Sequence, residues 1–135
     1  MGNRILIVDD EADLIDAMTT MLDNAGYIVE ESQSGAEGLG TYIASLLKEA
    51  PYDLILLDIR MPGMSGIEVL ESIRKVEQLR GIQPGAGVPI ILLSGYKQPF
   101  LTNFNRECDD FMMKPVEERA LLEKIEQKTR PRQLN

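Results

Sequence analysis

The sequence predicts an α/β fold in which a doubly wound, five-stranded parallel sheet is flanked by helices on both faces, a (βα)5 arrangement. Three observations predict this fold class. Five short apolar runs recur along the 135 residues, the strongest runs are continuous rather than alternating, and segments with helical spacing separate them. Continuous apolar runs are typical of strands that are buried on both faces. Strands that alternate with helices favour parallel pairing through right-handed crossovers.

The five apolar runs are the expected strands, at residues 5–8, 27–29, 54–57, 88–93 and 111–113. Between the first two runs, apolar residues recur on one stripe with helical spacing. This stripe consists of Leu14, Ala17, Met18, Met21 and Leu22. Gly26 follows it, and a glycine in this position is a typical helix stop. The opening segment is therefore predicted to be strand, helix and strand.

The second and third helices have the same start signal. Ser34 with Glu37, and Ser65 with Glu68, have the spacing of a capping box, in which each residue satisfies a backbone N–H of the other. An apolar stripe follows each signal: Leu39, Tyr42, Ile43, Leu46 and Leu47 in the second helix, and Ile67, Leu70 and Ile73 in the third. Each helix is expected to bury one face.

The segment after the fourth strand predicts only a short or irregular helix. Phe100, Leu101 and Phe104 suggest an apolar face, but a proline and two asparagines weaken the helix. The glycine-rich run 83–87 predicts a loop. It is not a phosphate-binding loop, because the Lys and Ser or Thr that such a motif requires do not follow it.

The last predicted helix begins at about Glu117 and carries the stripe Leu121, Leu122 and Ile125. The residues after it have no apolar period. We therefore expect one domain at 1–128, and a tail or the start of a linker at 129–135.

Composition excludes several function classes. The formal net charge of -8 disfavours nucleic acid, since binding to phosphate backbones relies on clustered basic residues. No run is apolar for long enough to span a membrane, and the first residues lack a signal-peptide layout, so we expect a cytoplasmic protein. With no His, the chain lacks the usual general base and any phosphohistidine role. The single Cys108 is expected to be an ordinary half-buried thiol.

Polar residues follow four of the predicted strands. Asp9 and Asp10 follow the first strand, Asp58 the third, Ser94 the fourth and Lys114 the fifth. The carboxyl ends of parallel strands share one edge of a sheet, where ligands bind, so these side chains should converge. Carboxylates about 4 Å apart repel by roughly 4 kcal/mol per pair at an effective dielectric of 20. Mg²⁺ would relieve this repulsion, because it takes oxygen ligands and leaves positions for phosphate.

Each of these residues also has a more ordinary interpretation. Asp9 or Asp10 could cap the following helix, and Asp58 could form a turn with the Met-Pro-Gly sequence after it. Ser94 before a glycine could be a turn residue, and Lys114 before a proline a solvated surface charge. The coincidence at four strand ends makes the ordinary interpretations together improbable.

The motifs around these residues resemble a known family, the receiver domains of two-component response regulators. The matching segments are ILIVDDE, LILLDIRMPGMSG, ILLSG and DDFMMKP, in that order, and they cover nearly the whole chain. The resemblance implies a fold of the CheY and flavodoxin type. It also implies that the domain is a signalling switch rather than an enzyme, one that catalyses only its own phosphorylation and dephosphorylation.

The resemblance further implies a role for each site residue. Asp58 would be the phosphorylated residue, with Asp10, Asp58 and the backbone carbonyl of Arg60 binding Mg²⁺ and Asp9 assisting through water. Ser94 and Lys114 would hold the phosphoryl oxygens. A cis peptide would precede Pro115, and Phe111 would be an aromatic switch that turns inward when Ser94 moves. The alternative for Phe111 is a plain core aromatic residue.

The partners follow from the same resemblance. The phosphodonor would be a histidine kinase or a histidine phosphotransfer protein, and the output would be a downstream protein or a fused effector domain. The sequence leaves open whether the protein also forms a homodimer. The sequence also suggests that Arg60 and Tyr96, two residues beyond Asp58 and Ser94, overhang the phosphoryl group and slow its hydrolysis.

Three other function classes are weaker. A phosphohydrolase of the haloacid dehalogenase kind needs a second Asp two residues after its nucleophile, but Glu11 and Arg60 stand in those places. A flavodoxin-like electron carrier needs a phosphate-binding loop after the first strand, where Asp9 and Asp10 would repel phosphate. The main alternative is a receiver-like docking module that works without phosphorylation.

Overall fold

A computed structural model describes residues 3–95 and 107–129. The strands are β1 (Arg4–Val8), β2 (Ile28–Ser32), β3 (Leu54–Asp58), β4 (Ile90–Ser94) and β5 (Asp110–Met113), and the helices are α1 (Ala12–Asn24), α2 (Gly35–Leu47), α3 (Gly66–Leu79) and α4 (Glu118–Thr129). All four pairings in the sheet are parallel, in the order β2-β1-β3-β4-β5. The predicted fold class is confirmed.

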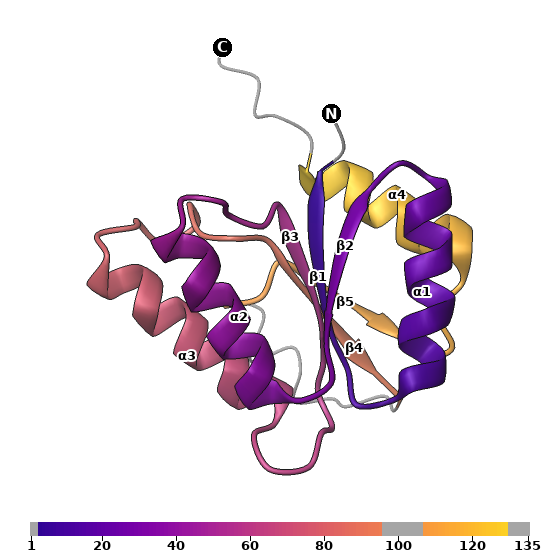
Figure 1. The fold of residues 1–135 in the computed structure, drawn as a ribbon, viewed down its shortest axis with the longest axis horizontal. Coiled ribbons are helices and arrows are strands. Elements are labelled where there is room, and N and C mark those ends of the chain that lie inside the picture. The colour runs from indigo at the N-terminus through magenta and orange to yellow at the C-terminus, as the bar shows by residue number, and fades with distance from the viewer. Residues whose placement is uncertain (1–2, 96–106, 130–135) are drawn as a thin grey trace.

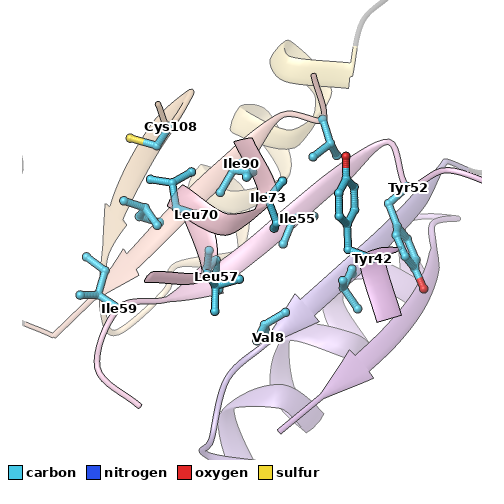
Figure 2. Close-up of a cluster of buried hydrophobic side chains, with 14 of the residues drawn as sticks. Val8, Tyr42, Tyr52, Ile55, Leu57, Ile59, Leu70, Ile73, Ile90 and Cys108 are labelled. Atoms are coloured by element: carbon cyan, nitrogen blue, oxygen red, sulfur yellow. The ribbon is translucent and has the colours of Figure 1, made fainter. Parts of the chain in front are cut away.

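The helices cover the two faces of the sheet in pairs, with α1 and α4 on one face and α2 and α3 on the other (Figure 1). Strands β1, β3 and β4 lie in the middle of the sheet, and nearly all their side chains are buried. This explains why their apolar runs are continuous. Figure 2 shows the core beneath α2 and α3, where Leu57, Leu70 and Ile90 pack together.

The second strand differs from its prediction. The apolar run at 27–29 predicts a strand there, but β2 runs from Ile28 to Ser32 and three of its five side chains, including Ile28, are exposed. The reason is its place at the edge of the sheet, where only one neighbour, β1, pairs with it. An edge strand can therefore include polar residues that apolar periodicity does not detect.

The second and third helices begin where their capping signals predict, but two of the predicted apolar stripes include residues that are exposed. Ser65 and Glu68 form the complete capping box, and the Ser34 hydroxyl accepts a hydrogen bond from the backbone of Glu37. Ala17 and Leu47 were predicted to be buried, but both are exposed, Leu47 by 70%. The stripe in α2 is therefore narrower than expected.

The loop at 83–87 is present between α3 and β4. The predicted weak helix around Phe100, Leu101 and Phe104 lies outside the described residues, as do residues 130–135 of the predicted tail. In the described part of the chain, α4 extends to Thr129. No helix there is both long and apolar enough to cross a membrane.

Candidate functional site

The site lies at the edge of the sheet where the parallel strands end. Asp9 directly follows β1, Asp58 is the last residue of β3, and Lys114 directly follows β5. The ammonium nitrogen of Lys114 lies 3.1 Å from Asp9 Oδ2 and 3.2 Å from Asp58 Oδ1. Three residues that are far apart in the sequence therefore meet as expected, because the strand register aligns the ends of β1, β3 and β5.

Both of the central carboxylates are withdrawn from solvent. Asp9 is completely buried and Asp58 is 3% exposed. Burial, and then the negative charge of Asp9, raise the pKa of Asp58 to about 6. Burial alone would lower the pKa of Lys114, but its ion pairs with Glu11, Asp9 and Asp58 raise that pKa above its usual range. The pocket therefore holds more negative charge than one ammonium group balances.

The acidic residues fit a divalent cation. One carboxylate oxygen from each of Asp9, Asp10, Glu11 and Asp58 lies within 4.8 Å of the others. The Asp9 Oδ2 atom is buried and accepts no hydrogen bond from the described residues, although Lys114 stands beside it. Asp10 and Glu11 are exposed, so the cluster is open to solvent on one side. Hard oxygen donors with an open side are the ligand set that Mg²⁺ prefers.

Glu11 is a site residue that the sequence analysis did not assign. Its backbone N–H donates to Asp9 Oδ1 at 2.9 Å, and its carboxylate accepts a bond from Lys114 at 3.0 Å. The signal that could have found it is the run of three acidic residues after the first strand. In the sequence, Glu11 stands out only as the residue that breaks a phosphohydrolase motif.

A glycine allows α3 to begin directly against the phosphoacceptor candidate. A side chain on Gly66 would place its Cβ 2.1 Å from the backbone oxygen of Asp58, and the Gly66 N–H donates to the Ile59 carbonyl at 2.9 Å. Only glycine permits this approach of helix and strand. The start of α3 therefore holds the backbone around Asp58.

The other predicted site residues differ in burial. Ser94 is buried at the end of β4, next to Lys114, whose backbone N–H donates to the Ser94 carbonyl at 2.7 Å. Arg60 is exposed, and Phe111 on β5 is 39% exposed. The Lys114–Pro115 peptide is cis, as the resemblance implies. Tyr96 lies outside the described residues, so its shielding role stays a prediction.

Comparison with known proteins identifies the family. Residues 5–126 match the family model described as the response regulator receiver domain. The chain belongs to this family. This receiver domain is 33% identical over 129 residues to the transcriptional regulatory protein DltR of Streptococcus agalactiae, a match that covers 94% of the chain and 52% of DltR. The chain therefore spans about half the length of this relative.

Two solved structures are similar to the receiver domain. The response regulator protein TrrA from Thermotoga maritima, in complex with Mg²⁺-BeF, has a TM-score of 0.76 and 31% identity, with 93% of this chain and 98% of that chain covered. A chain from the co-crystal structure of the Saccharomyces cerevisiae phosphotransfer protein Ypd1 with the receiver domain of Ssk1 has a TM-score of 0.80 and 25% identity. That match covers 95% of this chain and 89% of that one.

The family gives the function in outline. The receiver domain is a phosphoacceptor of a two-component system, and it is a signalling switch rather than a conventional enzyme. Its acidic pocket, formed by Asp9, Asp10, Glu11 and Asp58, agrees with this function. Receiver domains interact with histidine kinases or phosphotransfer proteins, as the Ypd1 complex illustrates.

Proposed function

We propose that Asp58 is the residue that accepts the phosphoryl group. The observation that carries the proposal is its environment, since Asp58 is a nearly buried carboxylate beside Asp9 with Lys114 at 3.2 Å. Burial raises its pKa only to about 6, so Asp58 stays largely ionised at neutral pH and can act as a nucleophile.

The reaction is a transfer from a phosphorylated histidine of the donor protein. An oxygen of Asp58 attacks the phosphorus, the new O–P bond forms, and the bond between phosphorus and the donor nitrogen breaks. The electron pair of the broken bond stays on the donor imidazole. Lys114 balances negative charge at the acceptor, because its ammonium group already contacts Asp58. The product is an acyl phosphate.

We propose that the carboxylates of Asp10 and Asp58 and the carbonyl of Arg60 hold Mg²⁺, with Asp9 acting through water. The oxygens that cluster within 4.8 Å and the buried Asp9 Oδ2 support this assignment. When bound, Mg²⁺ would neutralise the charge of the carboxylates and of the phosphoryl oxygens. The structure of TrrA with Mg²⁺-BeF adds support from a relative.

The switch would involve Ser94 and Phe111. Ser94 is buried at the end of β4, and its carbonyl accepts a bond from the backbone of Lys114. In the proposed switch its hydroxyl would donate to a phosphoryl oxygen. Phe111 lies opposite Leu92 in the register of β4 and β5, two residues before Ser94. Its partial exposure is consistent with an outward state of the aromatic ring.

The donor is proposed to be a histidine kinase or a histidine phosphotransfer protein, and the output a separate protein or a fused effector domain. A cytoplasmic location is also proposed, because donors that are charged by ATP would act there. The domain boundary at 128, with 129–135 as a tail or linker, also remains a proposal. The family match ends at residue 126.

The proposal is tested by intact mass after incubation with a small-molecule phosphodonor and Mg²⁺. Wild-type protein should gain one labile phosphoryl group, and Asp58→Asn or a metal chelator should abolish the gain. Asp53→Asn is the matched control, because Asp53 is an exposed residue just before β3. No uptake under conditions in which another receiver domain reacts would instead favour the phosphorylation-independent docking module.

A further inference from the structure

A cavity of about 510 Å³ lies at the amino ends of β4 and β5. Its walls are the end of α3, the loop between α3 and β4, and residues 107–109, which come just before β5. We call it the amino-edge cavity. The Asp58 pocket lies at the opposite edge of the sheet, where the strands end. Sites for small molecules have volumes of about 300 to 1,000 Å³, so the amino-edge cavity is large enough to be one.

The loop that forms one wall of this cavity is held in place by Glu77. The Val88 N–H donates to Glu77 Oε2 at 2.8 Å, and a Cβ on Gly87 would collide with the Glu77 carboxylate. Gly85, in the same loop, has a φ of 86°, a conformation that favours a residue without a Cβ. The wall is therefore formed before any ligand arrives, which lowers the free-energy cost of binding.

The wall formed by residues 107–109 is held by Arg74. The Arg74 guanidinium donates to the Glu107 carbonyl at 2.7 Å and to Asp109 Oδ2 at 3.1 Å. Asp109 Oδ2 also accepts the Ile90 N–H at 2.8 Å. A carboxylate oxygen has two lone pairs, so these two bonds occupy Oδ2 and a ligand would meet Oδ1. This wall is therefore fixed as well, and it presents a carboxylate oxygen to the cavity.

Negative charge dominates the lining of the amino-edge cavity. Its charged side chains are three carboxylates and one guanidinium, those of Glu77, Glu107, Asp109 and Arg74. Arg74 forms ion pairs with Glu77 at 2.8 Å and with Asp109 at 3.1 Å, so its positive charge is already balanced. Arg80 follows α3 but does not line the cavity. The excess of carboxylates favours a cation over an anion.

The same lining also has an apolar part, to which Ile82, Pro84 and Cys108 contribute. Cys108 is 9% exposed and belongs to the core beneath α2 and α3 (Figure 2). Burial, and then the negative charge of Asp109, raise the pKa of its thiol, so the thiol is uncharged at neutral pH. In the described part of the chain, the acidic group that could hold a metal ion is the one around Asp58. The amino-edge cavity therefore suits an organic cation better than a metal ion.

We propose that the amino-edge cavity binds a small organic cation, with an ammonium or amidinium group on an apolar body. The charged group donates hydrogen bonds to the Glu107 carboxylate and to Asp109 Oδ1, and the apolar body packs against Ile82 and Pro84. No residue of the acidic pocket around Asp58 lines this cavity. The proposal therefore does not rest on phosphorylation.

The test is an NMR titration of the full chain with three probes of similar shape: benzamidine, which is a cation, benzamide, which is neutral, and benzoate, which is an anion. Benzamidine should give saturable shifts of the backbone amide signals of residues 81–87 and 107–109. Benzamide should bind at least about tenfold more weakly, and benzoate should leave these signals unchanged.

A pair of variants tests the role of the Glu107 carboxylate. Glu107→Gln should weaken the binding of benzamidine about fivefold, because it removes one charged acceptor. Glu71→Gln is the matched control, since it changes the net charge equally at an exposed position of α3 that does not line the cavity. This control should leave the affinity unchanged. Circular dichroism checks that both variants keep the fold.

Cys108 gives a second readout that needs no substitution, because it is the single cysteine of the chain. Methyl methanethiosulfonate, a neutral reagent, transfers a methylthio group to this thiol and releases methanesulfinate, and intact mass follows the reaction. Benzamidine should slow the labelling at the concentrations that shift the amide signals, and benzamide should not. The proposal is overturned if millimolar benzamidine gives no saturable shifts at residues 107–109, if benzamide binds as tightly, or if Glu107→Gln and Glu71→Gln have equal effects.

Discussion

Two regions of the molecule bury carboxylates, and they do so in opposite ways. Glu77, near the end of α3, is 3% exposed, like Asp58. Its oxygens accept bonds from the Tyr42 hydroxyl at 2.7 Å, the Arg74 guanidinium at 2.8 Å and the Val88 N–H at 2.8 Å. Asp58 instead shares its pocket with another buried carboxylate, Asp9, whose Oδ2 accepts no hydrogen bond from the described residues.

Burial of a carboxylate therefore serves stability in one region and chemistry in the other. Around Glu77 the donors come from α2, from α3 and from the loop before β4, so the carboxylate joins these three parts of the chain. At the Asp58 pocket, like charges are held together by the surrounding fold, and the pKa of Asp58 is raised to about 6. A group in such a pocket is stabilised only when a cation or a reaction removes the repulsion.

The largest effect should come from removing the Glu77 carboxylate, which accepts hydrogen bonds from Tyr42, Arg74 and Val88. We expect Glu77→Ala to lower the free energy of unfolding by about 3 to 4 kcal/mol, because it leaves the Tyr42 hydroxyl and the Val88 N–H without their acceptor and removes one of the two ion pairs of Arg74. Urea unfolding measures this. Glu71→Ala, at an exposed position of the same helix, should change stability by less than about 0.5 kcal/mol. Equal effects of the two variants would contradict the comparison.

In the acidic pocket, by contrast, we expect a substitution to make the protein more stable. Asp58→Asn should stabilise the metal-free protein by about 1 to 2 kcal/mol, because it removes a buried like charge from beside Asp9. Mg²⁺ should raise the thermal midpoint of the wild type and have little effect on the variant. Thermal unfolding with and without Mg²⁺ makes the measurement. A destabilised Asp58→Asn would mean that the Lys114 ion pair outweighs the repulsion.

The stability of the metal-free protein should also depend on pH through Asp58. Its pKa is raised from 3.8 to about 6, so the folded state holds this proton more tightly than the unfolded chain. The stability that Asp58 contributes is therefore present below about pH 4 and lost as the pH rises through 6. The difference in unfolding free energy between Asp58→Asn and wild type, measured in chelator, should grow from pH 4 to pH 7. A constant difference would argue against the raised pKa.

The smallest effects should separate two tyrosines of the same core. The hydroxyl of Tyr42 donates to buried Glu77, and that of Tyr52 donates to Glu30, whose side chain is 46% exposed. In the view of Figure 2 the two hydroxyls point in opposite directions. Tyr42→Phe should cost about 1 to 2 kcal/mol and Tyr52→Phe less than about 1 kcal/mol, since water can replace the partner only at Glu30. Chemical denaturation measures the loss of stability in both variants. A larger loss for Tyr52→Phe than for Tyr42→Phe would contradict the prediction.

The sequence alone determined the parts that depend on local pattern and on parallel-sheet geometry. Continuous apolar runs identified β1, β3 and β4, and the Ser65–Glu68 spacing marked the start of α3. Placing Asp9, Asp58 and Lys114 at strand ends was enough to predict that they meet, because parallel strands end at a common edge.

Which of the remaining residues are buried, and what they touch, depends on contacts between elements that are distant in the sequence. Periodicity placed Leu47 in the core, but the helix stripe gives no information on where the neighbouring helix ends, and Leu47 is exposed. Nothing near Glu77 in the sequence distinguishes it from the exposed Glu71, since its partners Tyr42 and Val88 come from other elements. Glu11 likewise became a contact of Lys114 only through the fold. The burial of a charge is settled by distant partners, and these become neighbours only when the chain has folded.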